Sequence, residues 1–139
     1  MGLLLLGCSF YLWRGFGSRP LTVFAVLSSI GTACVGIFNE SFGAIHGVFS
    51  ALTFFSIGIF AVLAHRVVRP PMSYFSIVAG VATLAATVLY GSHVYLGLGA
   101  GGMERMIVYP VLLWSIGFGG YLMAIGQTVK YSESLENEK

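Results

Sequence analysis

The hydrophobic positions of this chain gather into long, nearly uninterrupted runs that are separated by short polar gaps. Five runs stand out, at Gly2–Trp13, Leu21–Phe38, Gly43–Ala64, Tyr74–Leu96 and Met106–Ile125. A helix rises about 1.5 Å per residue and the hydrocarbon core of a bilayer is about 30 Å thick, so each of the last four can cross it. The first run covers only about two-thirds of that distance. The pattern predicts an all-α polytopic membrane helix bundle, with four full transmembrane helices and a short N-terminal apolar helix.

The connections between the long runs are short, which favours an up-and-down arrangement of neighbouring helices. They comprise Asn39–Phe42, His65–Ser73 and the glycine-rich stretch Gly97–Arg105, whose glycines we expect to let an outer loop turn tightly. We therefore predict a single transmembrane bundle over residues 1–129. The remaining residues, 130–139, are polar and lack apolar periodicity. We expect them to form a cytoplasmic tail that is frayed or disordered.

Composition excludes an ordinary soluble domain. Of 139 residues, 57% are hydrophobic and 9% are charged, whereas a soluble domain carries about 25% charged residues. The net charge of +2 and the lack of a basic stripe predict no nucleic-acid partner. The two cysteines, Cys8 and Cys34, both fall inside apolar runs, so we interpret them as small core residues and not as a disulfide. We expect no cofactor.

The distribution of basic residues predicts the orientation in the membrane. Six of the seven lie on one side of the predicted topology, namely Arg14, Arg19, Arg66, Arg69, Lys130 and Lys139, and Arg105 alone lies on the other. Because basic residues are retained in cytoplasmic loops, the chain is expected to be a multi-pass protein of the cell membrane with a cytoplasmic C-terminus. Aromatic residues expected at the membrane interfaces are Tyr74, Phe75, Tyr109, Trp114 and Tyr131.

Small residues recur at a spacing of four in each long run, which predicts faces where helices pack closely. These stripes are Ser28, Thr32 and Gly36; Gly43, Gly47 and Ala51; Ala79, Thr83, Thr87 and Gly91; and Ser115 and Gly119.

Ionisable residues collect at the predicted outer ends of the helices, where the bilayer makes an unpaired charge costly. Together with neighbouring polar residues they form a candidate polar pocket, comprising Asn39, Glu40, His46, Ser50, Tyr90, His93, Glu104, Arg105 and Tyr109. Two polar stripes run inward from this end, one through Ser50 and Thr53 and the other through Tyr90, Thr87 and Thr83. If the stripes face one another, they line an outward-opening pocket.

Four interpretations of this pocket remain open. It could bind a membrane lipid or small amphiphile, with Arg105 as the partner of a phosphate, and this is the favoured one of the functional readings. It could belong to a membrane enzyme, either hydrolase-like or metal-dependent, that uses the same glutamate, histidine and arginine residues. Because no spacing such as His-x-x-x-His marks a metal site, we expect no metal. The protein could instead be a structural or assembly subunit, with a homo-oligomer or membrane-complex partner. In the fourth, the charged groups simply pair to satisfy helix ends.

Three stretches resemble a known family. They are "VGIFNESFGAIHGVFSALTFF", followed by "RVVRPPMSYFS", and "YLGLGAGGMERMIVYPVLLWSIGFGGYLM". They are similar to the domain of unknown function 998, a family of largely prokaryotic membrane proteins, and the resemblance extends from about Leu3 to Ala124. It implies about six spans in a typical member, so this chain would lack the first span. Members often carry proline at the position of Asn39. The resemblance implies an architecture and no activity.

Overall fold

The computed structural model describes residues 2–137 and leaves the side chains of 129, 130 and 132–137 undescribed. Its elements are α1 (Gly2–Phe16), α2 (Arg19–Ile37), the short 3-10 helix η1 (Glu40–Phe42), α3 (Ala44–Ala64), α4 (Met72–Gly91) and α5 (Gly99–Asn137). Helices α2 to α5 are each long and apolar enough to cross a membrane, and α1 is a shorter apolar helix. The predicted all-α architecture of four spans and one short helix is therefore confirmed.

The glycine-rich connection and the tail differ from the sequence prediction. Helix α5 begins at Gly99, so most of Gly97–Arg105 is helical and the predicted loop is wrong there. Its first turns are held by Met103, which is buried next to α4, and such tertiary packing overrides weak glycine propensity. The expectation of a frayed tail is wrong for 130–137, because extending an existing helix needs no new nucleus. Residues 138 and 139 lie outside the described range.

Helix α4 ends earlier than predicted, at Gly91 instead of Leu96. The connection that follows turns sharply, with the backbone of His93 at φ 59° and that of Leu96 at φ 49°. These left-handed conformations are uncommon for residues other than glycine, asparagine and aspartate. A continuous helix is incompatible with them, so the loop occupies 92–98.

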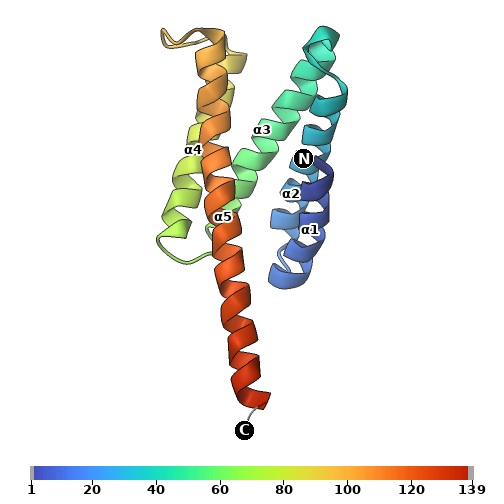
Figure 1. Cartoon of the computed structure of the whole chain (residues 1–139). Helices are drawn as coiled ribbons and strands as arrows, with labels where there is room; N and C mark the ends of the chain where they lie inside the picture. The colour runs from blue at the N-terminus through green and yellow to red at the C-terminus, as the bar shows by residue number, and fades with distance from the viewer. Residues whose placement is uncertain (1, 138–139) are drawn as a thin grey trace.

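Consecutive helices pack against one another in chain order, and α5 also contacts α3. Figure 1 shows two arms, α1 with α2 and α4 with α5, and α3 crossing obliquely between them. The α2–α3 and α4–α5 connections lie at one end of the molecule, here called the Glu–His end after Glu40, His46, His93 and Glu104. The α1–α2 and α3–α4 connections lie at the opposite, basic end, which carries Arg14, Arg19, Arg66 and Arg69.

Only part of the predicted small-residue packing is found. Ala79, Thr83 and Thr87 are buried along α4, as that stripe predicts, whereas its last member, Gly91, is exposed. By contrast, the stripe of Gly43, Gly47 and Ala51 is wrong, because its residues are exposed. The close approach of α3 and α4 instead joins Gly58 and Gly80. A Cβ added at Gly80 would lie 2.7 Å from the Gly58 carbonyl oxygen, so the two backbones are nearly in contact.

Helix α5 contains Pro110, which cannot donate a hydrogen bond to the Met106 carbonyl. The next carbonyl, that of Ile107, accepts a hydrogen bond from the Thr83 hydroxyl of α4 at 3.0 Å. Threonine hydroxyls commonly satisfy backbone groups near a proline inside membrane helices. Since α5 begins at Gly99, Pro110 lies inside the helix, and the hydrogen bond from Thr83 joins α4 to α5 beside it.

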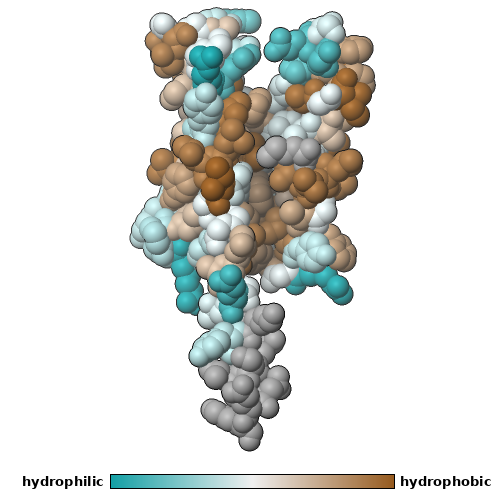
Figure 2. Space-filling view, viewed as in Figure 1, coloured by the Kyte–Doolittle hydropathy of each residue, from teal (hydrophilic) through white to brown (hydrophobic). Residues whose placement is uncertain are grey.

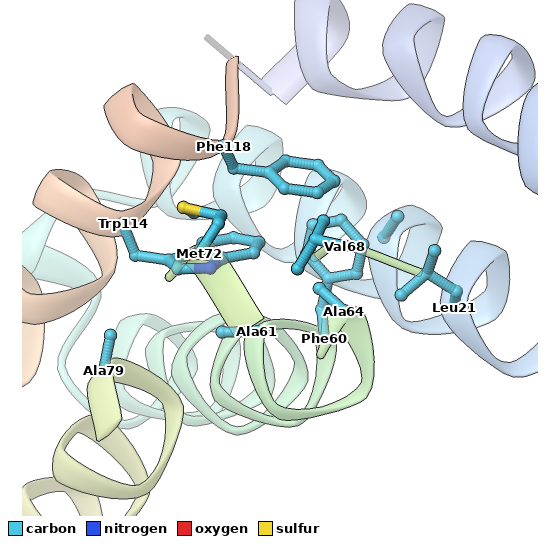
Figure 3. Packing of buried hydrophobic residues seen from close by; sticks show 10 residues of the cluster. Leu21, Phe60, Ala61, Ala64, Val68, Met72, Ala79, Trp114 and Phe118 are labelled. Atoms are coloured by element: carbon cyan, nitrogen blue, oxygen red, sulfur yellow. The ribbon is translucent and has the colours of Figure 1, made fainter. Parts of the chain in front are cut away.

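The main hydrophobic core joins the two arms through α3 and α5. Figure 3 shows Trp114 and Phe118 of α5 near Phe60 of α3, with Leu21 and Val68 beside them. Trp114 stacks on Phe118 at a centroid distance of 4.9 Å and meets Phe60 edge-on at 5.3 Å. Its Nε1–H donates to the Ser76 hydroxyl at 2.8 Å. Trp114 is only 1% exposed, so its predicted place at a membrane interface is wrong.

Candidate functional site

The nine candidate residues predicted from the sequence lie on two corners of the Glu–His end. One corner surrounds the α2–α3 turn, and the other surrounds the α4–α5 connection (Figure 1). The first contains Asn39, Glu40, His46 and Ser50, and the second contains Tyr90, His93, Glu104, Arg105 and Tyr109. Each corner has its own hydrogen bonds.

At the α2–α3 corner, the polar groups stabilise the turn itself. The Asn39 carboxamide oxygen accepts a hydrogen bond from the Ser41 backbone N–H at 3.1 Å and a short one from the Ser41 hydroxyl. His46 Nδ1 lies 2.7 Å from the Phe38 carbonyl oxygen, and because a carbonyl can only accept, Nδ1 carries the proton. Glu40 is exposed at the start of η1, and Ser50 is half-buried. The turn thus uses Asn39 and His46 for its own structure.

At the α4–α5 corner, two tyrosines form hydrogen bonds with a glutamate and a histidine. The Tyr90 hydroxyl donates to Glu104 Oε1 at 2.8 Å, which joins the end of α4 to the start of α5. His93 Nδ1 lies 3.0 Å from the Tyr95 hydroxyl, and the rings of Tyr90 and Tyr95 meet edge-on at 5.8 Å. Arg105 and Tyr109 are exposed on the first turns of α5.

Within the described residues, no hydrogen bond, ion pair or ring contact joins the two corners. The inward stripes also lie in different interfaces. Thr53 packs against Gly31 of α2, whereas Thr83 bonds to α5. Figure 2 shows hydrophilic atoms at the tops of both arms with a hollow between them. The condition that the two stripes face one another is therefore not met by Thr53 and Thr83.

A cavity with a volume of about 520 Å³ lies elsewhere, between α1 and α5. Its floor is formed by α2 and α3, and Figure 2 shows hydrophobic side chains along the hollow between the arms. We call it the α1–α5 slot. Its lining residues are Leu5, Cys8, Ser9, Tyr11, Leu12, Gly15, Phe16, Ala25, Ser28, Ser29, Ile57, Phe60, Trp114, Ser115, Phe118, Gly119, Leu122, Ile125 and Gly126. None of the nine candidate residues is among them.

The walls of the slot behave as an apolar surface although they contain four serines. The Ser9 hydroxyl donates to the Leu5 carbonyl at 2.9 Å, and Ser28 and Ser29 both donate to Ala25, at 3.0 and 2.6 Å. Ser115 likewise donates to Val111 at 2.7 Å. Because each hydroxyl proton is used within its own helix, the slot is left with mainly hydrocarbon and aromatic contacts.

Sequence reasoning did not find this slot. Cys8 is exposed and lines it, so the interpretation of Cys8 as a packed core residue is wrong. A local signal does exist on α1, where Leu5, Cys8, Leu12 and Gly15 follow the three- and four-residue spacing of one helix face. The other wall belongs to α5, more than a hundred residues away, and no local pattern predicts that pairing.

The described residues contain no group of three or more His, Cys, Asp or Glu side chains placed to hold a metal ion. The structure is that of a multi-pass helical membrane protein, with four apolar candidate spans, a short apolar helix and an apolar slot between them. Its sequence matches the family model of a protein of unknown function, DUF998, over residues 1–121, and the chain belongs to that family. Neither the curated proteins nor the solved structures give a match.

Proposed function

We propose that the protein binds a membrane lipid or another small amphiphile, whose hydrocarbon chain occupies the α1–α5 slot. The observation that carries the proposal is the slot itself, an apolar cavity of about 520 Å³ between the short helix α1 and the candidate spans α2, α3 and α5. Ligand pockets in proteins measure about 300–1,000 Å³ and are lined mainly by apolar and aromatic side chains. The slot has both properties.

The packing of the helices supports a resident chain. Among the described helices, α1 packs on α2 alone, so nothing from α5 closes the gap in front of it. In a bilayer an empty gap forfeits dispersion contacts on every wall, so hydrocarbon is favoured to fill it. Trp114, Phe118 and Phe60 form a rigid aromatic wall because they are locked against one another. Such a wall selects a chain by shape.

This proposal keeps the ligand class expected from the sequence and changes its location. The sequence pointed to the Glu–His end and to Arg105, neither of which borders the slot. The alternative of a membrane enzyme requires a cavity beside a histidine or glutamate. Neither the slot nor a second cavity on α4, beside Leu84 and Val88, is lined by a histidine or a glutamate.

Filling the slot is expected to expel the ligand. Gly119 lines the slot, and a Cβ at this position meets nothing within 4 Å, so Gly119→Phe adds a ring without a backbone clash. We expect the fraction of protein that retains lipid in native mass spectrometry to fall about tenfold, which corresponds to about 1.4 kcal/mol.

The matched control is Gly120→Phe on the adjacent position of α5, which is equally free of contacts and does not line the slot. It should retain lipid as the unmodified protein does. Gly126→Leu fills the same slot from another position and serves if Gly119→Phe folds poorly. Equal lipid retention by the slot variants and the control would remove the proposal.

We also propose that the protein lies in the cell membrane with its basic end and C-terminus in the cytoplasm, as the positive-inside rule favours. The test uses single cysteines, at Ser92→Cys of the Glu–His end and at Gln127→Cys late in α5, with Cys8 and Cys34 replaced by serine. Both positions are exposed. An impermeant maleimide should label Ser92→Cys in intact cells and Gln127→Cys only after lysis. The reverse pattern contradicts the orientation.

A further inference from the structure

The basic end of the molecule carries an excess of positive charge that its own carboxylates do not balance. Four arginines lie there and are exposed, namely Arg14, Arg19, Arg66 and Arg69. In residues 1–128 the only carboxylate side chains are Glu40 and Glu104, and both lie at the opposite end. The tail that follows adds three glutamates and two lysines on this side, so the net charge there stays positive and an anion meets net attraction.

Two of these arginines are attached to segments that meet beside the α1–α5 slot. The backbone N–H of Arg69 donates to the Tyr121 hydroxyl of α5 at 2.9 Å, one residue before the slot-lining Leu122. Arg19 begins α2, and Leu21 and Val68, which are close to Arg19 and Arg69 in the chain, belong to the same core cluster (Figure 3). The two arginines thus stand on neighbouring segments at the basic end of the slot.

The guanidinium groups at this end are available to a ligand. In the part of the chain that the structure describes, no hydrogen bond or ion pair engages the side chains of Arg19, Arg66 or Arg69. Arg14 differs, because its guanidinium lies over the Phe10 ring at 5.5 Å on α1. Guanidinium binds phosphate through paired N–H donors and is less strongly hydrated than ammonium, so it suits a site at the membrane surface.

We infer that the occupant of the slot is an anionic glycerophospholipid whose phosphate binds Arg19 and Arg69 at the basic end. The inference rests on the proposed function and deepens it by naming the head-group charge and the end at which it binds. One acyl chain lies in the slot, and the head group stays at the level of Phe16 and Gly126, the lining residues of α1 and α5 nearest the basic end. With the basic end in the cytoplasm, the lipid comes from the inner leaflet, which is rich in anionic lipid.

The charges at the two ends of the molecule favour an orientation in which the lipid head group faces the basic end. At the Glu–His end, Arg105 shares its surroundings with Glu104, so a phosphate there meets repulsion as well as attraction. The slot also lies away from that end, because its α5 wall begins only at Trp114. The head group of a lipid whose chain occupies the slot therefore lies nearer to the basic end than to the Glu–His end.

The test measures head-group selectivity. The purified full chain is delipidated, offered equal amounts of phosphatidylglycerol and phosphatidylcholine with matched acyl chains, and examined by native mass spectrometry. We expect the unmodified protein to prefer phosphatidylglycerol about tenfold. The double variant Arg19→Gln/Arg69→Gln should bring the ratio of the two retained lipids close to one. The total amount of retained lipid should fall by a smaller factor than this ratio does. Arg105→Gln, at the opposite end, is the matched control and should leave the ratio unchanged.

Each outcome decides between the two claims. Equal retention of both lipids by the unmodified protein, or an unchanged preference in the double variant, overturns the inference and leaves the slot proposal standing. Loss of preference in Arg105→Gln alone also overturns it, because the head group then lies at the Glu–His end. Absence of any retained lipid removes the proposed function itself. Glycerol phosphate, which has the head group without chains, should not displace the bound lipid at equal concentration.

Discussion

Replacing Trp114 with alanine is expected to destabilise the folded protein by about 3–5 kcal/mol, the range found when a large buried aromatic is truncated. Its ring stacks on Phe118, meets Phe60 edge-on and is almost fully buried, so truncation leaves a cavity between α3 and α5. Helix association within a bilayer depends on such packing, because lipid supplies no hydrophobic drive to bring helices together. The loss should therefore separate the two arms.

The measurement is unfolding of the purified protein in mild detergent titrated with sodium dodecyl sulfate. Trp114→Phe is the matched variant, since it keeps an aromatic ring beside Phe60 and Phe118 but loses the rest of the indole, including the N–H that donates to Ser76. We expect it to cost clearly less than the alanine variant, with about 0.6 kcal/mol of the loss due to the hydrogen bond. An alanine variant as stable as the phenylalanine variant would show that the ring packing does not hold α5 to α3.

Replacing Gly80 with leucine is expected to destabilise the protein by about 3 kcal/mol, at the upper end of overpacking effects. The Cβ alone would lie 2.7 Å from the Gly58 carbonyl oxygen and 2.8 Å from the Val62 amide nitrogen, both of which are backbone atoms of α3. Backbone cannot rotate aside as a side chain does, so α3 and α4 must separate along the whole contact.

Gly91→Leu on the same helix is the control, because a Cβ at Gly91 meets nothing within 4 Å and the added side chain faces outward. Both variants are compared with the unmodified protein in the same detergent unfolding assay, with helix content followed by circular dichroism. The control should remain within about 0.5 kcal/mol of the unmodified protein. If the two leucine variants are equally stable, the close approach of α3 and α4 does not exist in the folded protein.

The candidate residues of the Glu–His end show how much of a site can be predicted from membrane topology alone. Alternation of short connections suffices to assign Glu40, His46, His93 and Glu104 to one end of the bundle, where Figure 1 shows their connections. Which groups meet there is a different matter. The bond between Tyr90 and Glu104 depends on the sharp turn after α4, and nothing in the residue pattern sets the separation of the two corners.

The errors of sequence reasoning share one physical cause. Trp114 resembles an interfacial aromatic by residue type, but it is buried in the core that joins α3 and α5, where the Ser76 hydroxyl satisfies its N–H. Cys8 resembles a core residue because its run is apolar, yet among the described helices α1 packs on α2 alone and Cys8 is exposed. Hydropathy measures the preference for a non-aqueous environment and does not distinguish protein from lipid.

The sequence by itself determined that this chain forms four membrane-spanning helices and a shorter apolar one, and that four of its five arginines gather at one end. Those features follow from the length of apolar runs that a bilayer requires and from the alternation of helix direction. Only the tertiary structure decided that α1 and α5 leave a slot between them, and that α3 and α4 meet at Gly58 and Gly80. Both depend on the shapes of surfaces distant in the chain, which no local pattern encodes.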